Sequence, residues 1–91
     1  MLLSENDINE KLREMENWKQ EGKEITKTFK FKNFIESMGF VNKVAILAER
    51  ADHHPDILIK YSKVNINLST HSEGGITEKD FKLANQIDEL N

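Results

Sequence analysis

The sequence predicts a single α+β domain over residues 1–91, with its elements in the order α-β-β-α-β-β-α. The first supporting observation is the spacing of apolar residues, which switches along the chain between the helical period of about 3.6 and the strand period of about 2. The second is that no linker, repeat or low-complexity stretch interrupts the pattern. We therefore expect a four-stranded antiparallel sheet with the helices on one face.

A helix is predicted at the N-terminus. Ser4, with Asp7 three residues later, is typical of an N-cap, whose side-chain oxygen accepts a hydrogen bond from the first turn. The apolar residues that follow are spaced for one helical face, and they are Ile8, Leu12 and Met15. We expect this helix to end near Glu16.

A β-hairpin should follow, with strands at residues 18–21 and 24–31 joined by a turn at Gly22 and Lys23. In the second strand the apolar residues share one parity, which places them on one face of the sheet: Ile25, Phe29 and Phe31. Lys27 has the same parity, so it interrupts the apolar face of the predicted strand.

The longest predicted helix opens at Asn33, with Glu36 three residues later, and ends before Pro55. Its wide apolar stripe consists of Phe34, Met38, Val41, Ala45 and Ala48, flanked by Ile35, Val44 and Leu47. A helix with such a stripe should cover the sheet. Gly39 costs a helix about 1 kcal/mol relative to alanine, which suggests close packing there. Because Pro55 pushes the preceding residue out of the α region, His54 should already be extended.

A second strand pair is expected at residues 57–61 and 64–70, the latter with regularly alternating apolar residues. Gly74 and Gly75 predict the turn after it. Thr77, with Asp80 three residues later, is typical of the N-cap of a final helix. The inward-facing residues of that helix should be Phe81, Ala84, Ile87 and Leu90.

Composition limits the classes of function. The 16 acidic and 13 basic residues give a formal net charge of −3 without any basic run, which argues against a nucleic-acid partner. The chain has no cysteine, so it offers no disulfide, thiolate nucleophile or cysteine-ligated zinc. The acidic N-terminus is neither a signal nor a transit peptide, and no apolar run reaches membrane length. We expect a cytoplasmic protein with no membrane partner.

All three histidines fall near the predicted ends of elements, with His53 and His54 at the exit of the long helix and His71 at the end of a strand. Histidine, with an unperturbed pKa of ~6.5, both gives and takes a proton near neutrality. A helix exit and a strand end can lie side by side in a small sheet. The sequence therefore favours an acid/base site, provided that the three side chains converge.

Other interpretations of the histidines stay open. Imidazolium at a helix C-terminus interacts favourably with the helix dipole, by ~0.3–1 kcal/mol, so His53 and His54 fit a purely structural role. A metal site would use nearby carboxylates, but adjacent histidines rarely aim at one ion and the HExxH pattern is absent. No serine lies in a G-x-S-x-G context, which argues against a catalytic triad.

Three segments combine into a specific pattern. Residues 48–56 contain His53-His54-Pro55, residues 61–71 end in Thr70-His71, and residues 74–80 contain Thr77-Glu78-Lys79-Asp80. Together they closely resemble the pterin-4a-carbinolamine dehydratases. The resemblance covers nearly the whole chain and includes Trp18, Phe29, Phe31, Phe34, Phe40, Val44 and Ala45. It implies the α+β fold of that family.

The resemblance implies a hydro-lyase that converts 4a-hydroxytetrahydropterin, formed when an aromatic amino acid hydroxylase uses its pterin cofactor, to quinonoid dihydropterin. This step in tetrahydrobiopterin recycling needs proton transfers but no metal, redox cofactor or nucleophile. The implied catalytic residues are His53, His54 and His71. The residues implied for lining the pocket or orienting the imidazoles are Glu49, Asp52, Pro55, Thr70 and Asp80. Alternatively, Asp80 only caps the last helix and Glu49 only faces solvent.

Two positions depart from the family pattern. Ile57 stands where tryptophan is most frequent, and Ser62 stands where asparagine is common. A missing ring removes stacking surface worth ~0.5–1.5 kcal/mol, which would affect the affinity for a pterin bound near Ile57.

Assembly and partners follow from size and resemblance. A homodimer or homotetramer is expected, because edge strands need cover and family members are typically dimers or tetramers. The expected ligand is a small-molecule pterin. Animal members also bind a homeodomain transcription factor, so the alternative function is that of a small oligomeric interaction protein without a catalytic role.

Overall fold

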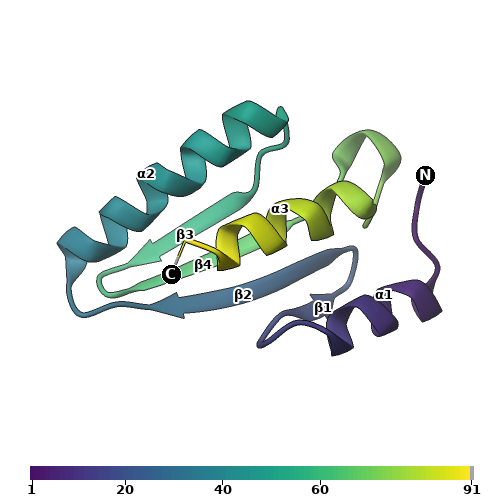
Figure 1. The fold of residues 1–91 in the computed structure, drawn as a ribbon, viewed down its shortest axis with the longest axis horizontal. Coiled ribbons are helices and arrows are strands. Elements are labelled where there is room, and N and C mark those ends of the chain that lie inside the picture. The colour runs from purple at the N-terminus through teal and green to yellow at the C-terminus, as the bar shows by residue number, and fades with distance from the viewer. Residues whose placement is uncertain (91) are drawn as a thin grey trace.

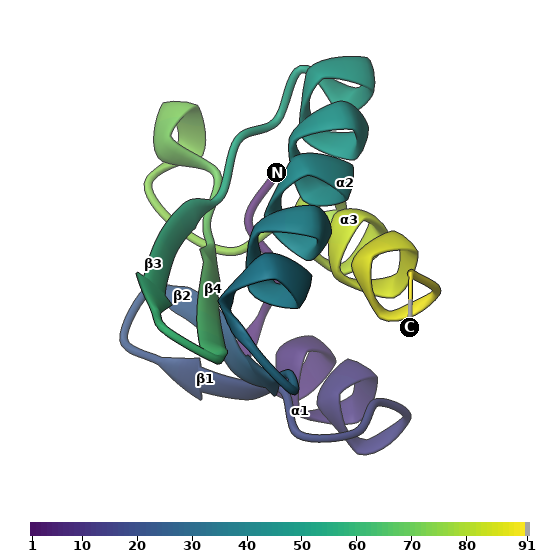
Figure 2. The ribbon, with the colours of Figure 1, turned by 90° about the vertical axis from the view of Figure 1, so that its left-hand side faces the viewer.

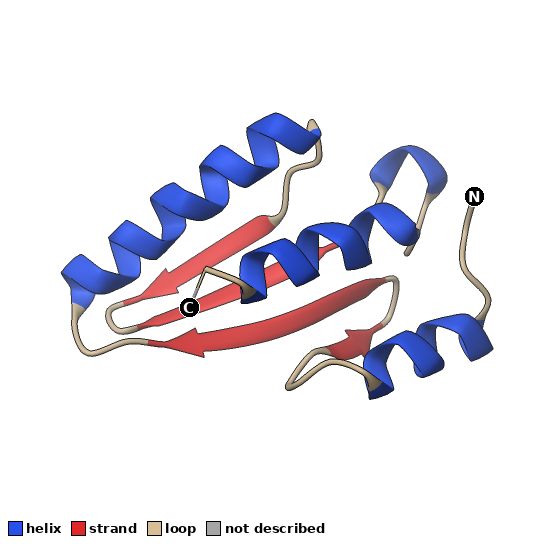
Figure 3. Ribbon diagram, viewed as in Figure 1, coloured by secondary structure: helices blue, strands red, loops and turns tan. Residues whose placement is uncertain are grey.

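The computed structural model describes residues 1–90 and confirms the α+β fold. Its elements are α1 (Glu5–Arg13), β1 (Lys19–Glu21), β2 (Glu24–Lys30), α2 (Phe34–Ala51), β3 (Asp56–Lys60), β4 (Lys63–Leu68), the short 3-10 helix η1 (His71–Glu73) and α3 (Glu78–Asp88) (Figure 1). The strands form one antiparallel sheet in the order β1-β2-β4-β3, and Figure 3 distinguishes them from the helices. The three α-helices cover one face of this sheet, as Figure 2 shows.

The core lies between the sheet and the three helices. On the central strands, Ile25 pairs with Leu68 and Phe29 pairs with Val64, and all four side chains are buried. Cross-strand partners share a face, so this register points both apolar rows toward the helices. The alternation predicted for β2 and β4 is therefore confirmed. No helix within residues 1–90 combines the length and apolarity that crossing a bilayer requires.

Several element ends differ from the prediction. The first helix ends at Arg13 instead of near Glu16, and Asn17 has a positive φ of 67° before Trp18 enters the core. The last strand ends at Leu68 instead of Thr70, because Thr70 leaves the ladder and forms an isolated bridge with Gly75. The chain between them forms η1, which the sequence pattern did not predict. In both places a nearby residue is held by tertiary structure, since Trp18 is buried in the core and Thr70 is bridged to Gly75.

The buried face of α2 is rotated relative to the predicted stripe. The buried positions are Ser37, Phe40, Val44 and Ala48, whereas Phe34, Ile35 and Ala45 are exposed. Ser37 fits the interior because its hydroxyl donates to the backbone carbonyl of Asn33 at 3.3 Å. Apolar residues surround more than one face of α2, so periodicity alone could not select the face that contacts the sheet.

Gly39 does not mark a close contact. No heavy atom from outside the local helix backbone lies within 4 Å of the position that a Cβ would occupy there, and the residue is exposed. The suggestion of tight packing at this glycine is therefore wrong for the single chain. The position lies on the outer side of α2.

Lys27 interrupts the apolar face of β2 without leaving its charge unpaired. Its Nζ binds the carboxylate of Asp88 on α3 at 2.8 Å and lies 4.7 Å from the centroid of the Phe29 ring. The indole Nε1 of Trp18 donates to the same carboxylate at 3.0 Å. This half-buried cluster ties α3 to the sheet, because burying either charge without its partner would be costly.

Candidate functional site

The three histidines line one cavity at the end of the sheet where α2 ends and α3 begins. This histidine cavity has a volume of about 420 Å³ and is lined by Asp52, His53, His54, Pro55, Asp56, Ser69, Thr70, His71, Ser72 and Lys79. Its residues come from the α2–β3 connection, the first residue of β3, the segment after β4, η1 and the first turn of α3. The convergence on which the acid/base interpretation depends is therefore present in the fold.

The end of α2 separates the two adjacent histidines. Asp52 adopts the left-handed conformation with a φ of 49°, and the backbone N–H of His53 donates to the carbonyl of Ala48 at 3.1 Å. His53, His54 and Pro55 then lie outside any helix or strand, and Pro55 disfavours a further helical turn before it. As a result, the His53 side chain is 11% exposed and that of His54 is 57% exposed.

His53 is held by a buried carboxylate. Its Nε2 lies 2.6 Å from Oδ1 of Asp80, whose side chain is fully buried. The other oxygen, Oδ2, accepts hydrogen bonds from the Thr70 hydroxyl and the Thr77 backbone N–H, both at 2.9 Å. The two threonine hydroxyls also lie 2.7 Å apart. Asp80 thus caps α3 and also contacts His53, so its carboxylate has a partner beyond the helix cap.

His54 has a different partner. Its Nε2 lies 2.5 Å from Oε2 of Glu49, which is one turn back on α2 and whose side chain is 77% exposed. His71 is exposed at the start of η1, directly after buried Thr70. One imidazole, that of His53, is therefore held by a buried carboxylate, whereas those of His54 and His71 are exposed to solvent.

The residues proposed to support the site divide into two groups. Asp52, Pro55 and Thr70 line the cavity, whereas Glu49 and Asp80 lie outside its lining and bind a histidine each. Sequence reasoning missed four lining residues, which are Asp56, Ser69, Ser72 and Lys79. All four stand within two residues of a residue that it named. Their proximity in sequence was the available signal.

Ile57 lies away from the cavity. Its cross-strand partner is Ile66, which is fully buried, and Ile57 packs half-buried against the core. Ile57 is not among the residues that line the cavity, although its neighbour Asp56 is, so the effect of isoleucine on ligand affinity stays a prediction. A tryptophan here would have to fit in the core instead.

The site offers polar and titratable groups rather than a metal-binding cluster. Within residues 1–90, no group of three or more histidine, aspartate or glutamate side chains is arranged to hold a metal ion. The imidazoles provide proton donors and acceptors, Lys79 adds a cation, and Asp52 and Asp56 add carboxylates. Such a set can move protons to and from a small polar ligand.

Comparison with known proteins identifies the family to which the sequence is similar. A family model described as pterin 4 alpha carbinolamine dehydratase matches residues 1–90. A protein of Sulfolobus acidocaldarius, provisionally named pterin-4-alpha-carbinolamine dehydratase, is 52% identical over 90 residues, which cover 99% of each chain. A relative from a Picosynechococcus species with the same provisional name is 50% identical, over 97% of this chain and 96% of its own.

Two solved structures are also similar. A transcriptional coactivator/pterin dehydratase from Brucella melitensis superposes with a TM-score of 0.93 at 40% identity, covering 97% of this chain and 96% of its own. A pterin dehydratase-like protein, identified as a RuBisCO assembly factor in the alpha-carboxysome, has a TM-score of 0.69 at 28% identity. That match covers 81% of this chain and 88% of the assembly factor.

Proposed function

The chain belongs to the pterin 4 alpha carbinolamine dehydratase family, and from this premise we propose that it removes water from 4a-hydroxytetrahydropterin to give quinonoid dihydropterin. The observation that carries the proposal is the convergence of His53, His54 and His71 on one cavity. A volume of about 420 Å³ suits a bicyclic ring with a short side chain, since small-molecule sites span ~300–1,000 Å³.

The proposed reaction consists of two proton transfers around one bond cleavage. The C4a–O bond breaks, the departing hydroxyl takes a proton and leaves as water, and a ring N–H gives up its proton so that the new double bond forms. Both steps suit imidazoles, because a group with a pKa near the working pH serves as acid or base. The three histidines are the catalytic residues in this proposal.

Asp80 is a positioning residue in the same proposal. An ionised carboxylate 2.6 Å from Nε2 of His53 requires that nitrogen to carry a proton and donate. Nδ1 of the same ring is then the atom that exchanges a proton with the ligand. Because Thr70 and Thr77 fix both the carboxylate and the start of α3, the ring is held in one orientation before the ligand arrives.

The proposal is tested by three single variants, His53→Ala, His54→Ala and His71→Ala. Each should lower carbinolamine turnover by about 10²–10⁴ where its proton transfer limits the rate, and by less where water or a neighbour replaces it. The measurement is turnover of freshly prepared carbinolamine, with the urea midpoint recorded for each variant. Chelator should leave the wild-type rate unchanged, since the proposed steps need only protons. Normal turnover in all three variants would contradict the proposal.

The second candidate is an interaction role without catalysis. It is favoured by the names of two similar structures, one a coactivator as well as a pterin dehydratase and the other an assembly factor. A protein that acts only as an adaptor should ignore pterins, whereas a dehydratase should bind an oxidised pterin and consume the carbinolamine. Fluorescence titration with an oxidised pterin therefore separates the two functions.

We also propose that the chain forms a homo-oligomer. Ile35 and Ile46 are 81% and 55% exposed, and they share one face of α2 because they lie about three turns apart. An uncovered apolar face of this kind is costly in water and favours a second copy as its cover. Light scattering should detect a dimer or tetramer at micromolar concentration.

Substitutions on two different surfaces test which one forms the contact between copies of the chain. Ile35→Lys with Ile46→Lys should shift the oligomer toward monomer, whereas Leu2→Lys, at a half-exposed apolar residue of the N-terminal segment, should not. A wild-type chain that scatters as a monomer would contradict the oligomer, and an unchanged mass in the double variant would assign it to another surface.

A further inference from the structure

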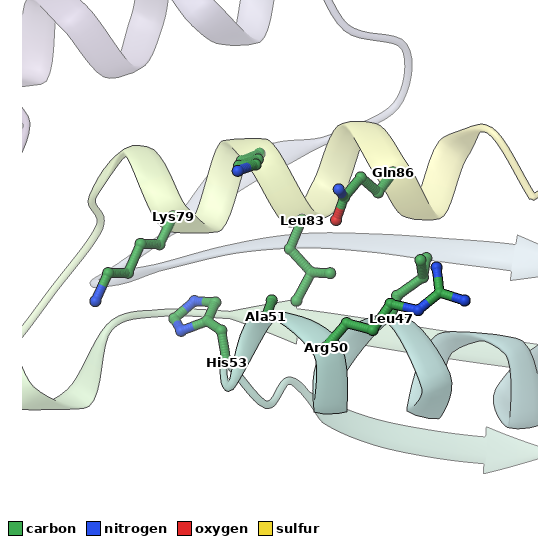
Figure 4. A pocket seen from close by; sticks show the side chains of 8 residues that line it. Leu47, Arg50, Ala51, His53, Lys79, Leu83 and Gln86 are labelled. Carbon is green, nitrogen blue, oxygen red and sulfur yellow. The ribbon is translucent and has the colours of Figure 1, made fainter.

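A second cavity opens between the last turns of α2 and the outer face of α3. This α2–α3 groove also has a volume of about 420 Å³, and it is lined by Leu47, Arg50, Ala51, His53, Lys79, Lys82, Leu83 and Gln86. Figure 4 shows its side chains projecting from both helices into the space between them. Two of its residues, His53 and Lys79, also line the histidine cavity. The groove is therefore the direct neighbour of the proposed catalytic cavity.

The charge of the groove is one-sided. Three of the lining residues are cations, namely Arg50, Lys79 and Lys82, and none of the eight residues that line it in the described chain is acidic. The ion pairs of residues 1–90 include none of these cations. In a chain of formal net charge −3, this local excess of positive charge is available to an anion.

Three of the nearby carboxylates bind other side chains, whereas Asp52 and Asp56 line the adjoining histidine cavity together with Lys79. Glu49 binds His54, Asp80 binds His53, and Glu78 binds Lys11 at 2.9 Å on the side of α3 that faces α1. The hydrogen bond to Glu78 raises the pKa of Lys11 above its ordinary value, which keeps Lys11 charged. None of these acids lines the groove itself, although Glu78 lines a neighbouring cavity together with Lys79 and Lys82.

The floor of the groove is apolar. Leu83 is 1% exposed, and Leu47 and Ala51 stand opposite it on α2, with Gln86 at the end nearer Arg50 (Figure 4). Lys79 lies beside the His53 ring, while the Arg50 guanidinium lies farther along the groove. An arginine fork and lysine ammonium groups suit the several oxygens of a phosphate, and because all three cations are exposed, each contact is screened by water.

We propose that the α2–α3 groove binds a phosphate group on the side chain of the pterin, while the ring occupies the histidine cavity. This inference rests on the proposed function and names the substrate class that the site prefers. A ligand seated against His53 and extended between the helices would carry its side chain from Lys79 toward Lys82 and Arg50. The geometry thus favours phosphorylated pterins over neutral ones.

The test compares two fluorescent oxidised pterins, neopterin and neopterin 3′-phosphate, titrated into the full-length chain. The phosphorylated ligand should bind about tenfold more tightly, which corresponds to a few solvent-screened charge contacts. Arg50→Gln combined with Lys82→Gln should remove this preference and leave the affinity for neopterin unchanged. Lys43→Gln is the matched control, since it removes the charge of an exposed lysine of α2 that lines neither cavity. It should retain the preference.

Competition by inorganic phosphate tests whether the phosphate group and the pterin ring bind at separate places. Inorganic phosphate should compete with neopterin 3′-phosphate but not with neopterin, because only the former occupies the groove in the proposed complex. If neopterin binds and the phosphate adds nothing, the groove proposal is overturned and the proposed function stands. If neither pterin binds, both are overturned. A preference that survives in the double variant also overturns the assignment to this groove.

Discussion

His53 and His54 are neighbours in the sequence and each binds a carboxylate through Nε2, yet the two pairs lie in different surroundings. The His53–Asp80 pair has side chains that are 11% and 0% exposed, and two further donors hold the carboxylate. The His54–Glu49 pair has side chains that are 57% and 77% exposed. A buried pair orients an imidazole firmly and is costly to break, whereas an exposed pair is screened and contributes little.

How firmly each imidazole is held therefore depends more on which element supplies the carboxylate than on the distance between the charges. Asp80 comes from the first turn of another helix and is locked by the cap of that helix, so the position of His53 depends on the tertiary structure. Glu49 belongs to the same helix exit as His54, and its long side chain remains free to move in solvent.

The largest effect is expected for Asp80→Asn. The amide keeps the shape of the side chain but no longer acts as a charged acceptor for His53, Thr70 and the Thr77 N–H together. We expect turnover of the carbinolamine to fall by about 10²–10⁴, as for other orienting carboxylates. The free energy of unfolding should fall by ~1–3 kcal/mol. Steady-state kinetics and urea denaturation measure the two effects, and a nearly normal rate would contradict the positioning role.

An intermediate effect is expected for Thr70→Val. The variant removes the hydroxyl that donates to Oδ2 of Asp80 but leaves the Thr77 N–H in place. Loss of this hydrogen bond and of the 2.7 Å contact with the Thr77 hydroxyl should lower the free energy of unfolding by ~1–2 kcal/mol, and turnover should fall by about tenfold because His53 is held less firmly. Thr70→Ser retains the hydroxyl and is the matched control. If serine fails to restore the rate, the hydrogen bond alone does not explain the requirement for Thr70.

The smallest effect is expected for Glu49→Gln. Because both partners are exposed, the free energy of unfolding should change by less than ~0.5 kcal/mol, and added salt should change it little further. Turnover should fall by no more than about threefold, since His54 stays at the cavity and water can replace the carboxylate as its partner. A loss comparable to that of Asp80→Asn would show that the two pairs support their histidines equally and that exposure is not the deciding factor.

Much of the fold was predictable because it depends on local rules. The caps at Ser4, Asn33 and Thr77 are present, and each side chain accepts the expected backbone hydrogen bond within its helix. The alternation of apolar residues predicted the buried rows of β2 and β4, and Pro55 predicted that α2 ends before it. These features follow from side-chain period and backbone stereochemistry, which operate over a few residues.

Other features required contacts between distant segments. The face of α2 that is buried, the short length of β4 and the direction of Ile57 all depend on which neighbour each segment packs against. The pairing of Lys27 with Asp88 joins residues 61 positions apart, so the sequence pattern showed only an interruption. A pattern that spans only a few residues cannot indicate that Asp88 is the partner of Lys27.

The candidate site shows the same division. The sequence by itself determined that three histidines stand at element ends, with Asp80 at a helix cap, because motif and capping patterns are local. Only the tertiary structure decided that these ends meet at one cavity, that Asp80 supports His53 and not His54, and that a cationic groove adjoins them. The physical reason is that the position of a side chain relative to a partner on another element is set by the packing of whole elements against the core, which sums many weak contacts spread along the chain.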